Sequence, residues 1–351
     1  MTNSPTLSGE PLRIRAAFLA ARAEKGLRHR DAAAAIGVTE GEAIASLAGD
    51  RAIRLKRDFP ALIAALQPLG DVMALTRNES VVHERVGTYL DASHQGHVGL
   101  VLGEDIDLRL FYSQWKHGFA LTEDTPNGPQ RSLQVFDATG TAVHKIFLKP
   151  QSNLAEYMAL VEAWSADDQT PGIAVEAAPP RPAARADAQI DVAGMRTAWS
   201  AMRDTHEFFG LLKQFNVTRT QALRLIGADY ACAVAADACH LMLTRAAAAG
   251  TAIMCFVGNP GIIQIHTGPV SNIKLHDTWI NVLDERFNLH LRADHIDSAW
   301  VVKKPTADGV VTSLELFDAH GETIAMFFGK RKPGIPELEE WRGLVADLPR
   351  L

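Results

Sequence analysis

Two residues of this sequence could do chemistry that packing alone does not require, an imidazole at His206 and a guanidinium at Arg109. His206 lies within the stretch 195–215, where large apolar or ring side chains recur every three or four residues. These side chains are Trp199, Met202, His206 and Phe209. Such spacing predicts one helix with all of them on a single face, so we expect His206 to point inward.

An inward imidazole has two interpretations, which the helix alone does not separate. In the first, His206 is a core histidine bonded to a carbonyl or carboxylate, and the helix by itself favours this reading. In the second, its Nε2 is an axial ligand of a metal. Haem iron is then the first candidate, because the surrounding side chains are bulky and apolar.

Arg109 lies in the segment IDLRLF at 106–111, where it alternates with Leu108 and Leu110. A strand would place it on the face opposite the leucines, and exposure to solvent is the ordinary outcome there. If that face instead looks into a cleft, the guanidinium becomes a fixed donor that keeps its proton. Such a group could hold a water or dioxygen over a metal. The spacing is compatible with both outcomes.

The composition argues against charged polymers and membranes as partners. The 351 residues include 35 Lys and Arg against 41 Asp and Glu, a formal net charge of -6, and 47% are hydrophobic. This balance gives no overall attraction to nucleic acid or to an anionic bilayer. Residues 1–15 are polar and lack a secretory signal, and no apolar run is long enough to cross a membrane. We therefore expect a cytoplasmic protein without membrane insertion.

Residues 30–50 raise one alternative, a DNA-binding regulator. Two alanine-rich segments broken at Gly37 have the pattern of a helix-turn-helix, and Thr39 with Glu42 predicts a capping box at the second helix. That helix would present carboxylates, Glu40 among them, to the phosphates. The charge argument favours a packing role and leaves DNA binding as a minor alternative.

The chain contains an internal duplication. The hairpin pattern RSLQVFDATGTAVHKIFL at 131–148 returns as TSLELFDAHGETIAMFFG at 312–329, with Ser132 and its five matching neighbours repeated 181 positions later. The segments IDLRL and LHLRA also align, which sets Arg109 beside Arg292. We expect an α+β fold in which each half has helices and a large antiparallel sheet.

The domain boundaries follow from this repeat and from a segment rich in Ala, Asp and Pro. Residues 1–164 form the first half, and residues 165–190 form a linker that we expect to be exposed and mobile. Residues 191–351 form the second half, which carries His206.

Several motifs in fixed order resemble a known family. They include ALTRNESVVHERVGTY at 74–89, GHVGLVLGEDIDLRLFYSQW at 96–115, DTHEFFGLL at 204–212 and FVGNPGIIQIHTGPVSN at 256–272. Together they resemble the hemin-degrading factors and cytoplasmic haem-transport proteins of bacterial haem-uptake systems, over nearly the whole chain. The resemblance implies a tandem repeat of α+β halves, stacked antiparallel sheets, and haem (iron protoporphyrin IX) in a cleft between the halves.

The resemblance also implies roles for individual residues. His206 would be the proximal ligand of the haem iron, and Arg109 the distal arginine that positions a water or oxygen. Arg219 and Lys304 would take the places of basic groups that hold the haem propionates, with Lys303 the alternative to Lys304.

The chain departs from the family pattern at one position. Members often carry Gln before FFG, where this chain has Met326. A polar contact from that strand to the porphyrin edge is therefore in question.

The implied function is haem binding in haem uptake and iron acquisition. In one version the protein opens the porphyrin with an external reductant and oxygen, an oxygenase-type activity in which His206 and Arg109 take part. In the alternative it is a haem chaperone that delivers haem to a separate haem oxygenase. A haem importer, a reductase or a haem oxygenase would be its protein partners. The same site serves both versions.

Overall fold

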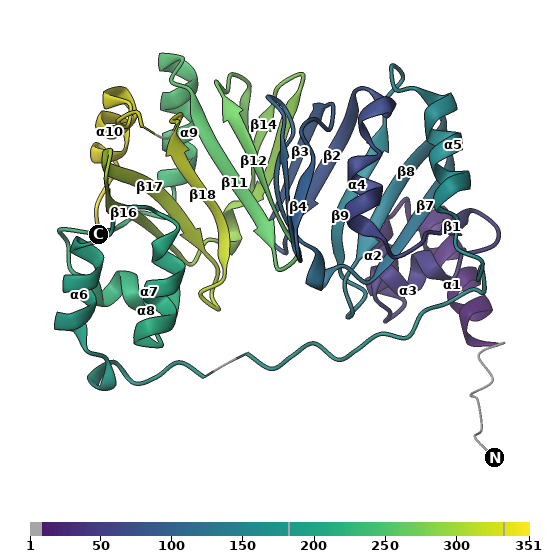
Figure 1. Ribbon diagram of the computed structural model, residues 1–351, viewed down its shortest axis with the longest axis horizontal. Coiled ribbons are helices and arrows are strands. Elements are labelled where there is room, and N and C mark those ends of the chain that lie inside the picture. The colour runs from purple at the N-terminus through teal and green to yellow at the C-terminus, as the bar shows by residue number, and fades with distance from the viewer. Residues whose placement is uncertain (1–8, 182, 333) are drawn as a thin grey trace. The chain divides into compact units, whose positions relative to one another are not determined.

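A computed structural model describes residues 9–181, 183–332 and 334–351 of the chain (Figure 1). The polar amino-terminal segment therefore has its first eight residues outside the described part. The strands form two nine-stranded antiparallel sheets, and with the helices they give the expected α+β class. Among the described residues, no helix combines the length and the apolar character needed to cross a membrane.

The chain divides into two compact units, each discontinuous in sequence. The first comprises Met1–Arg77, Glu84–Pro179 and Asn259–Ile263, and the second comprises Asn78–His83, Pro180–Gly258 and Gln264–Leu351. The boundaries expected from the sequence, with a linker at 165–190, stay a prediction.

The helices and strands up to residue 164 follow one another in this order: α1 (Glu10–Lys25), α2 (His29–Ala35), α3 (Glu40–Ala45), β1 (Ala52–Arg54), α4 (Phe59–Ala64), β2 (Val72–Arg77), β3 (Val81–Gly87), β4 (Ser93–Gln95), β5 (Val98–Leu102), β6 (Asp107–Phe111), β7 (His117–Thr125), β8 (Gly128–Phe136), β9 (Ala142–Leu148) and α5 (Leu154–Trp164). In the first unit the strand order is β1-β7-β8-β9-β2-β3 in one sheet and β6-β5-β4 in the other.

The remaining elements repeat this plan: α6 (Val192–Ser200), α7 (Glu207–Phe215), α8 (Arg219–Ile226), β10 (Ala231–Val234), α9 (Ala238–Ala249), β11 (Ile253–Asn259), β12 (Ile262–Gly268), β13 (Ile273–His276), β14 (Trp279–Leu283), β15 (Phe287–Arg292), β16 (Ser298–Thr306), β17 (Gly309–Phe317), β18 (Thr323–Gly329) and α10 (Glu339–Ala346). In the second unit the order is β10-β16-β17-β18-β11-β12 in one sheet and β15-β14-β13 in the other.

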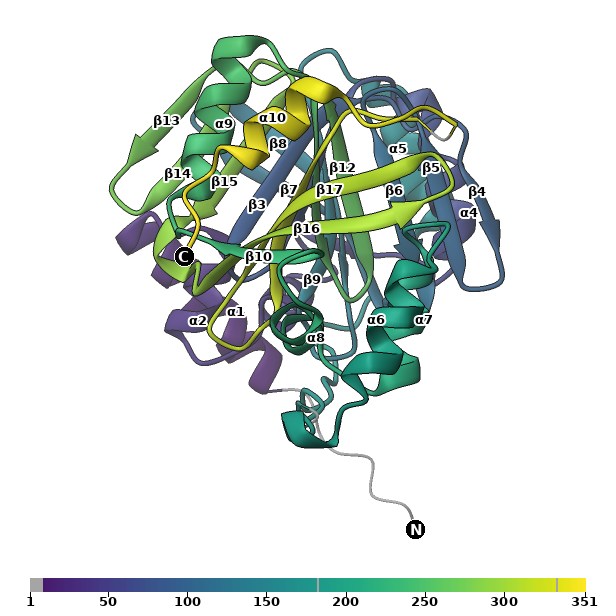
Figure 2. The same cartoon turned by 90° about the vertical axis from the view of Figure 1, so that its left-hand side faces the viewer.

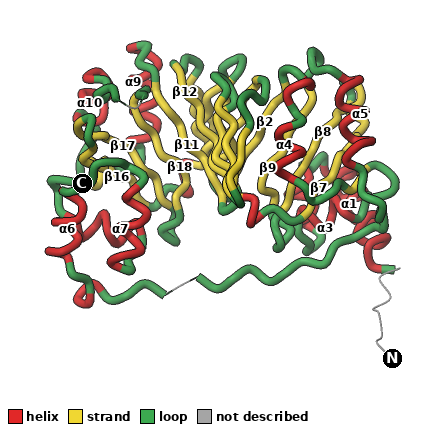
Figure 3. Tube along the Cα trace, viewed as in Figure 1, coloured by secondary structure: helices red, strands yellow, loops and turns green. Residues whose placement is uncertain are grey.

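Each unit covers both faces of its longer sheet with helices. In the second unit, Val301 packs in one core with α9 and α10, while Val302 packs in another with α6, α7 and α8. Neighbouring residues of a strand point to opposite faces, so the two helix groups lie on opposite sides of β16. Figure 2 shows both groups with β16 and β17 between them, and Figure 3 shows the same helices outside the strands. The first unit repeats this arrangement with α1–α3 on one face and α4 and α5 on the other.

Hairpin registers measure the repeat independently of sequence identity. Leu100 of β5 pairs with Arg109 of β6, and Asn281 of β14 pairs with His290 of β15. Both pairs are related by 181 residues, the same offset as the 131–148 and 312–329 hairpins. The structural counterpart of Arg109 is therefore His290, and the alignment of Arg109 with Arg292 was wrong by two positions.

The α3 helix has the packing role that the sequence favoured. Thr39 and Glu42 form the expected capping box, with the Thr39 side chain and the Glu42 side chain each bonded to the other's backbone N–H. Glu40 and Ile44 are buried, and Glu40 pairs with Lys145 of β9. A recognition helix needs an open face for the major groove, and the buried surface of α3 is the one that packs on the sheet.

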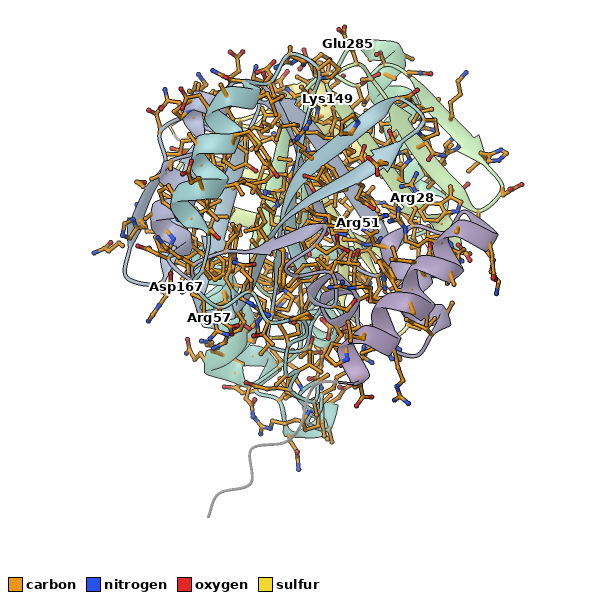
Figure 4. All side chains as sticks on the ribbon, turned by 90° about the vertical axis from the view of Figure 1, so that its right-hand side faces the viewer. Arg28, Arg51, Arg57, Lys149, Asp167 and Glu285 are labelled. Atoms are coloured by element: carbon orange, nitrogen blue, oxygen red, sulfur yellow. The ribbon has the colours of Figure 1, made fainter. Side chains whose placement is uncertain are left out.

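The start of the segment expected to be a mobile linker is packed on the first unit. Leu55 and Ser165 form a β-bridge, and the Arg54 guanidinium donates to the carbonyls of Thr170 and Gly172 at 2.6 and 2.8 Å. Figure 4 shows Arg57 and Asp167 at the same edge of this unit. The expectation of an exposed, mobile linker was thus wrong for residues 165–172, because a segment without periodicity can still bond through its backbone.

Candidate functional site

His206 does not lie within a continuous helix, which corrects the expectation of a single inward face over 195–215. The α6 helix ends at Ser200, and His206 is the N-cap residue of α7. Trp199 is buried as expected, whereas the His206 side chain is 92% exposed and Phe209 is exposed as well. Both the inward orientation and the core-histidine interpretation were therefore wrong.

The break in the helix has a local cause. One carboxylate oxygen of Asp204 accepts the backbone N–H of His206 at 2.8 Å, a turn that competes with helical hydrogen bonds. A new helix then begins with its own phase and buries Phe208 and Leu211. The apolar spacing across 195–215 combined two short helices into one.

The same oxygen of Asp204 lies 2.6 Å from Nδ1 of His206. The backbone N–H of His206, the imidazole and the charge of Arg331 together lower the pKa of Asp204, so this carboxylate is ionised near neutral pH. An ionised carboxylate assigns the proton to Nδ1 and leaves the lone pair on Nε2. A carboxylate behind an exposed, neutral imidazole is the arrangement that metal-ligating histidines commonly have. His206 therefore fits the axial ligand of a haem iron.

Arg219 and Lys304, expected to hold propionates, are brought together, but on a carboxylate of the protein. Arg219 donates two hydrogen bonds to Glu315 at 2.7 and 2.9 Å, and Lys304 donates one at 2.6 Å. Burial would raise the pKa of Glu315, but the two cations outweigh it and hold that pKa well below the usual range. Burial lowers the pKa of Lys304 to about 8.

The alternative between Lys303 and Lys304 has a structural counterpart in the alternation of β16. Lys304 is buried, with 4% of its side chain exposed, and Lys303 is exposed on the opposite face. Met326, at the position of the family glutamine, places its sulfur 3.1 Å from the Arg219 guanidinium. The strand β18 thus offers a weak acceptor to Arg219 in place of an amide.

Arg331, which follows β18, was missed by the sequence reasoning. Its charge contributes to the low pKa of Asp204, and its Nη2 lies 3.8 Å from an oxygen of Asp308. Its Nε is buried and has no hydrogen-bond partner among the described residues. The motif FFGKRKPG contained Arg331, but only tertiary structure reveals a cation beside the Asp204–His206 pair. Such a guanidinium can still bind an anion.

Arg109 lies in the first unit, on β6, with the alternation that the sequence predicted. Leu108 and Leu110 are buried, and the Arg109 side chain is about one-third exposed at 34%. Its Nη1 donates to the carboxylate of Asp107 and, at 3.2 Å, to the carbonyl of Leu108. The guanidinium is therefore oriented by its own strand. Since Arg109 and His206 belong to different units, the cleft between halves stays a prediction.

The first unit has a counterpart of His206, and it is closed. His29 begins α2 as His206 precedes α7, but His29 is only 9% exposed and lies 2.7 Å from Glu123. Glu123 is 181 residues before Lys304 and so occupies the same place in the repeat. Of these two helix-starting histidines, His206 is the one whose ring is open to a ligand.

Comparison with known proteins identifies the family. The family model for the haemin-degrading HemS.ChuX domain matches residues 37–164 and again residues 216–348. The chain belongs to the haemin-degrading HemS/ChuX family. The two matches confirm both the resemblance and the tandem duplication that the sequence indicated.

Relatives of the HemS/ChuX family align over nearly their full length. The chain is 41% identical to the hemin transport protein HmuS of Yersinia pestis over 333 residues, 94% of this chain and 96% of the relative. It is similar to the crystal structure of holo-PhuS, a heme-binding protein from Pseudomonas aeruginosa, at 48% identity and a TM-score of 0.96, covering 97% and 100% of the two chains. It is also similar to ChuS, an E. coli heme oxygenase, at 36% identity and a TM-score of 0.86, covering 96% and 99%.

Proposed function

We propose that this protein is a cytoplasmic haem-binding protein of haem uptake, in which Nε2 of His206 ligates the iron. The observation that carries the proposal is the exposed imidazole held by Asp204 through Nδ1 at 2.6 Å. Similarity to holo-PhuS and to hemin transport proteins supports haem as the ligand. A neutral imidazole with a free Nε2 is a good axial ligand for haem iron.

The haem carries two propionates, and Arg331 supports the binding of one of them. Its buried Nε lacks a partner among the described residues, and it lies on the same unit as His206. Arg219 and Lys304 are already bonded to Glu315, so propionate binding by them would require that ion pair to open. Arg331 is therefore the better propionate partner.

We further propose that the protein opens the porphyrin to release iron. Bound haem would supply the iron at which oxygen and electrons from an external reductant react. His206 would hold the haem in place, and Arg109 would donate hydrogen bonds to a distal water or dioxygen. Similarity to ChuS, described as a heme oxygenase, supports this version.

The second candidate function is that of a haem chaperone which delivers haem intact to a separate oxygenase. The higher identity to PhuS, described as a heme-binding protein, favours it. In this version His206 and Asp204 keep their roles, and Arg109 contributes to affinity without serving any reaction.

A reductant assay separates the two functions. The hemin complex is mixed with ascorbate in air, with catalase present to remove free peroxide, and the Soret band and released iron are followed. Degradation predicts loss of the band with iron release, slowed by about two orders of magnitude in Arg109→Ala, the effect of removing one positioned donor. A stable Soret band with no released iron would refute degradation and leave the chaperone.

A further inference from the structure

Phe208 lies between two cations at the first turn of α7. The guanidinium carbon of Arg219 is 4.9 Å from the ring centroid, and Nζ of Lys304 is 4.5 Å from it. The ring also packs edge-on against Trp199 at 4.9 Å and is only 3% exposed. Cations over a desolvated aromatic ring attract it electrostatically, so Phe208 is held from several sides.

Glu315 holds both of these cations in place. Its two oxygens accept three hydrogen bonds from Arg219 and Lys304, and a fourth comes from the hydroxyl of Ser313 at 2.8 Å. The carboxylate is completely buried, so its bonds are shielded from competing water. The guanidinium and the ammonium therefore keep fixed positions against the ring of Phe208.

The position of Phe208 in turn determines where His206 lies. Only one residue separates them, and His206 has few contacts of its own because its side chain is exposed. The Asp204 bond orients the imidazole relative to the turn, whereas Phe208 anchors the turn to the sheet. Loss of this anchor would leave the imidazole oriented locally but free to move as part of a loose helix end.

We propose that Glu315, Arg219, Lys304 and Phe208 form a pedestal that positions His206 for iron, and that Arg219 and Lys304 do not bind the propionates. This inference rests on the proposed function, since it assigns the residues that support the same axial ligand. A residue that supports a ligand from behind typically contributes roughly 10- to 100-fold in metal affinity. The pedestal residues act through His206 and are positioning residues.

The first unit supplies a matched control. Glu40 and Lys145 form a buried ion pair there, as Glu315 and Lys304 do in the second unit. Glu40→Gln removes a buried carboxylate charge of similar exposure without touching the second unit. Its effect on haem affinity measures general destabilisation alone.

The test compares two ligands that differ only at the propionates, hemin and iron protoporphyrin IX dimethyl ester. Each is titrated into the full-length wild-type protein and into the Phe208→Leu, Glu315→Gln, Arg219→Gln and Glu40→Gln variants, with the Soret band as readout. The pedestal predicts binding roughly tenfold weaker in the first three variants, by the same factor for both ligands, and unchanged affinity in Glu40→Gln. Phe208→Leu keeps all charges, so it tests the pedestal even if Glu315→Gln fails to fold.

A second readout needs no haem. Hydrogen exchange of the α7 amides in the haem-free protein should accelerate about tenfold in Phe208→Leu, while the amides of α9 keep their rates. Unchanged α7 exchange would contradict the pedestal.

The outcomes separate this inference from the proposed function. If the loss in Arg219→Gln is present with hemin and absent with the dimethyl ester, Arg219 binds a propionate and the pedestal is refuted. Equal affinities of Phe208→Leu and wild type, with His206 still required, also refute it. If His206→Ala binds hemin as tightly as wild type does, the proposed function itself is wrong.

Discussion

Oδ1 of Asp204 lies 2.6 Å from Nδ1 of His206 and also accepts the backbone N–H of His206 at 2.8 Å. A single carboxylate oxygen therefore ends one helix segment, orients the imidazole and selects its tautomer. The exposed side of the ring carries the Nε2 lone pair, which is the atom a metal would bind. Local backbone structure and ligand chemistry thus have the same origin at this position.

The charge of Asp204 should strengthen iron ligation. Asp204→Asn keeps a side-chain oxygen for the turn but removes the negative charge behind the imidazole, so hemin affinity should fall roughly tenfold. Dissociation kinetics measured by transfer of hemin to apomyoglobin would give the change. Asp229→Asn is the matched control, since Asp229 is an exposed partner of Arg196 in the same unit. Equal dissociation rates in both variants would show that the carboxylate does not act on the ligand.

Lys304 and Lys303 are neighbours with opposite environments, so their removal should differ greatly. Lys304→Met leaves the buried Glu315 with Arg219 as its remaining cation, and we expect a loss of about 3 kcal/mol in the free energy of unfolding. Lys303→Met removes an exposed charge and should change it by less than about 0.5 kcal/mol. Urea denaturation of both variants measures this difference, and similar stabilities would contradict the buried ion pair.

The buried His144 should make the first unit sensitive to acid. Its Nδ1 lies 3.0 Å from the Thr76 hydroxyl and its Nε2 2.6 Å from the Tyr89 hydroxyl, and burial lowers its pKa from 6.5 to about 3. The unfolded chain takes up a proton near pH 6.5, whereas the folded protein does so only near pH 3. Stability is therefore lost as the pH falls through this window, by about 1.4 kcal/mol per pH unit.

A comparison of two histidine variants checks this prediction. His144→Asn should reduce stability at pH 7 but flatten its dependence on pH between 6.5 and 3. His276→Asn removes an exposed imidazole and should leave the slope unchanged. Equal slopes in wild type and His144→Asn would rule out His144 as the source of acid sensitivity.

Features that depend on neighbouring residues could be predicted from the sequence. The Thr39–Glu42 capping box and the turn at Gly140 were both found where expected, because caps and tight turns need only a few adjacent side chains. The repeat was also visible, since the two hairpins keep the same residues at the same offset. These observations were sufficient for the α+β class and for the duplication.

The position of the candidate site could not be predicted in the same way. Periodicity treated 195–215 as one helix because it does not register the backbone bond that Asp204 accepts. The partner of Arg219 is Glu315, 96 residues away, and only packing brings them together. Both Lys304 and Arg219 were accordingly expected to be free for a ligand, and the structure shows them bonded to a buried carboxylate.

The most direct test of the account is a hemin titration of wild type and His206→Gly, followed at the Soret band with and without added imidazole. The account predicts a sharp band at one hemin per chain in wild type, its loss or shift in His206→Gly, and its return when imidazole occupies the space of the missing ring. A His206→Gly protein that gives the wild-type spectrum and affinity without imidazole would contradict ligation by His206.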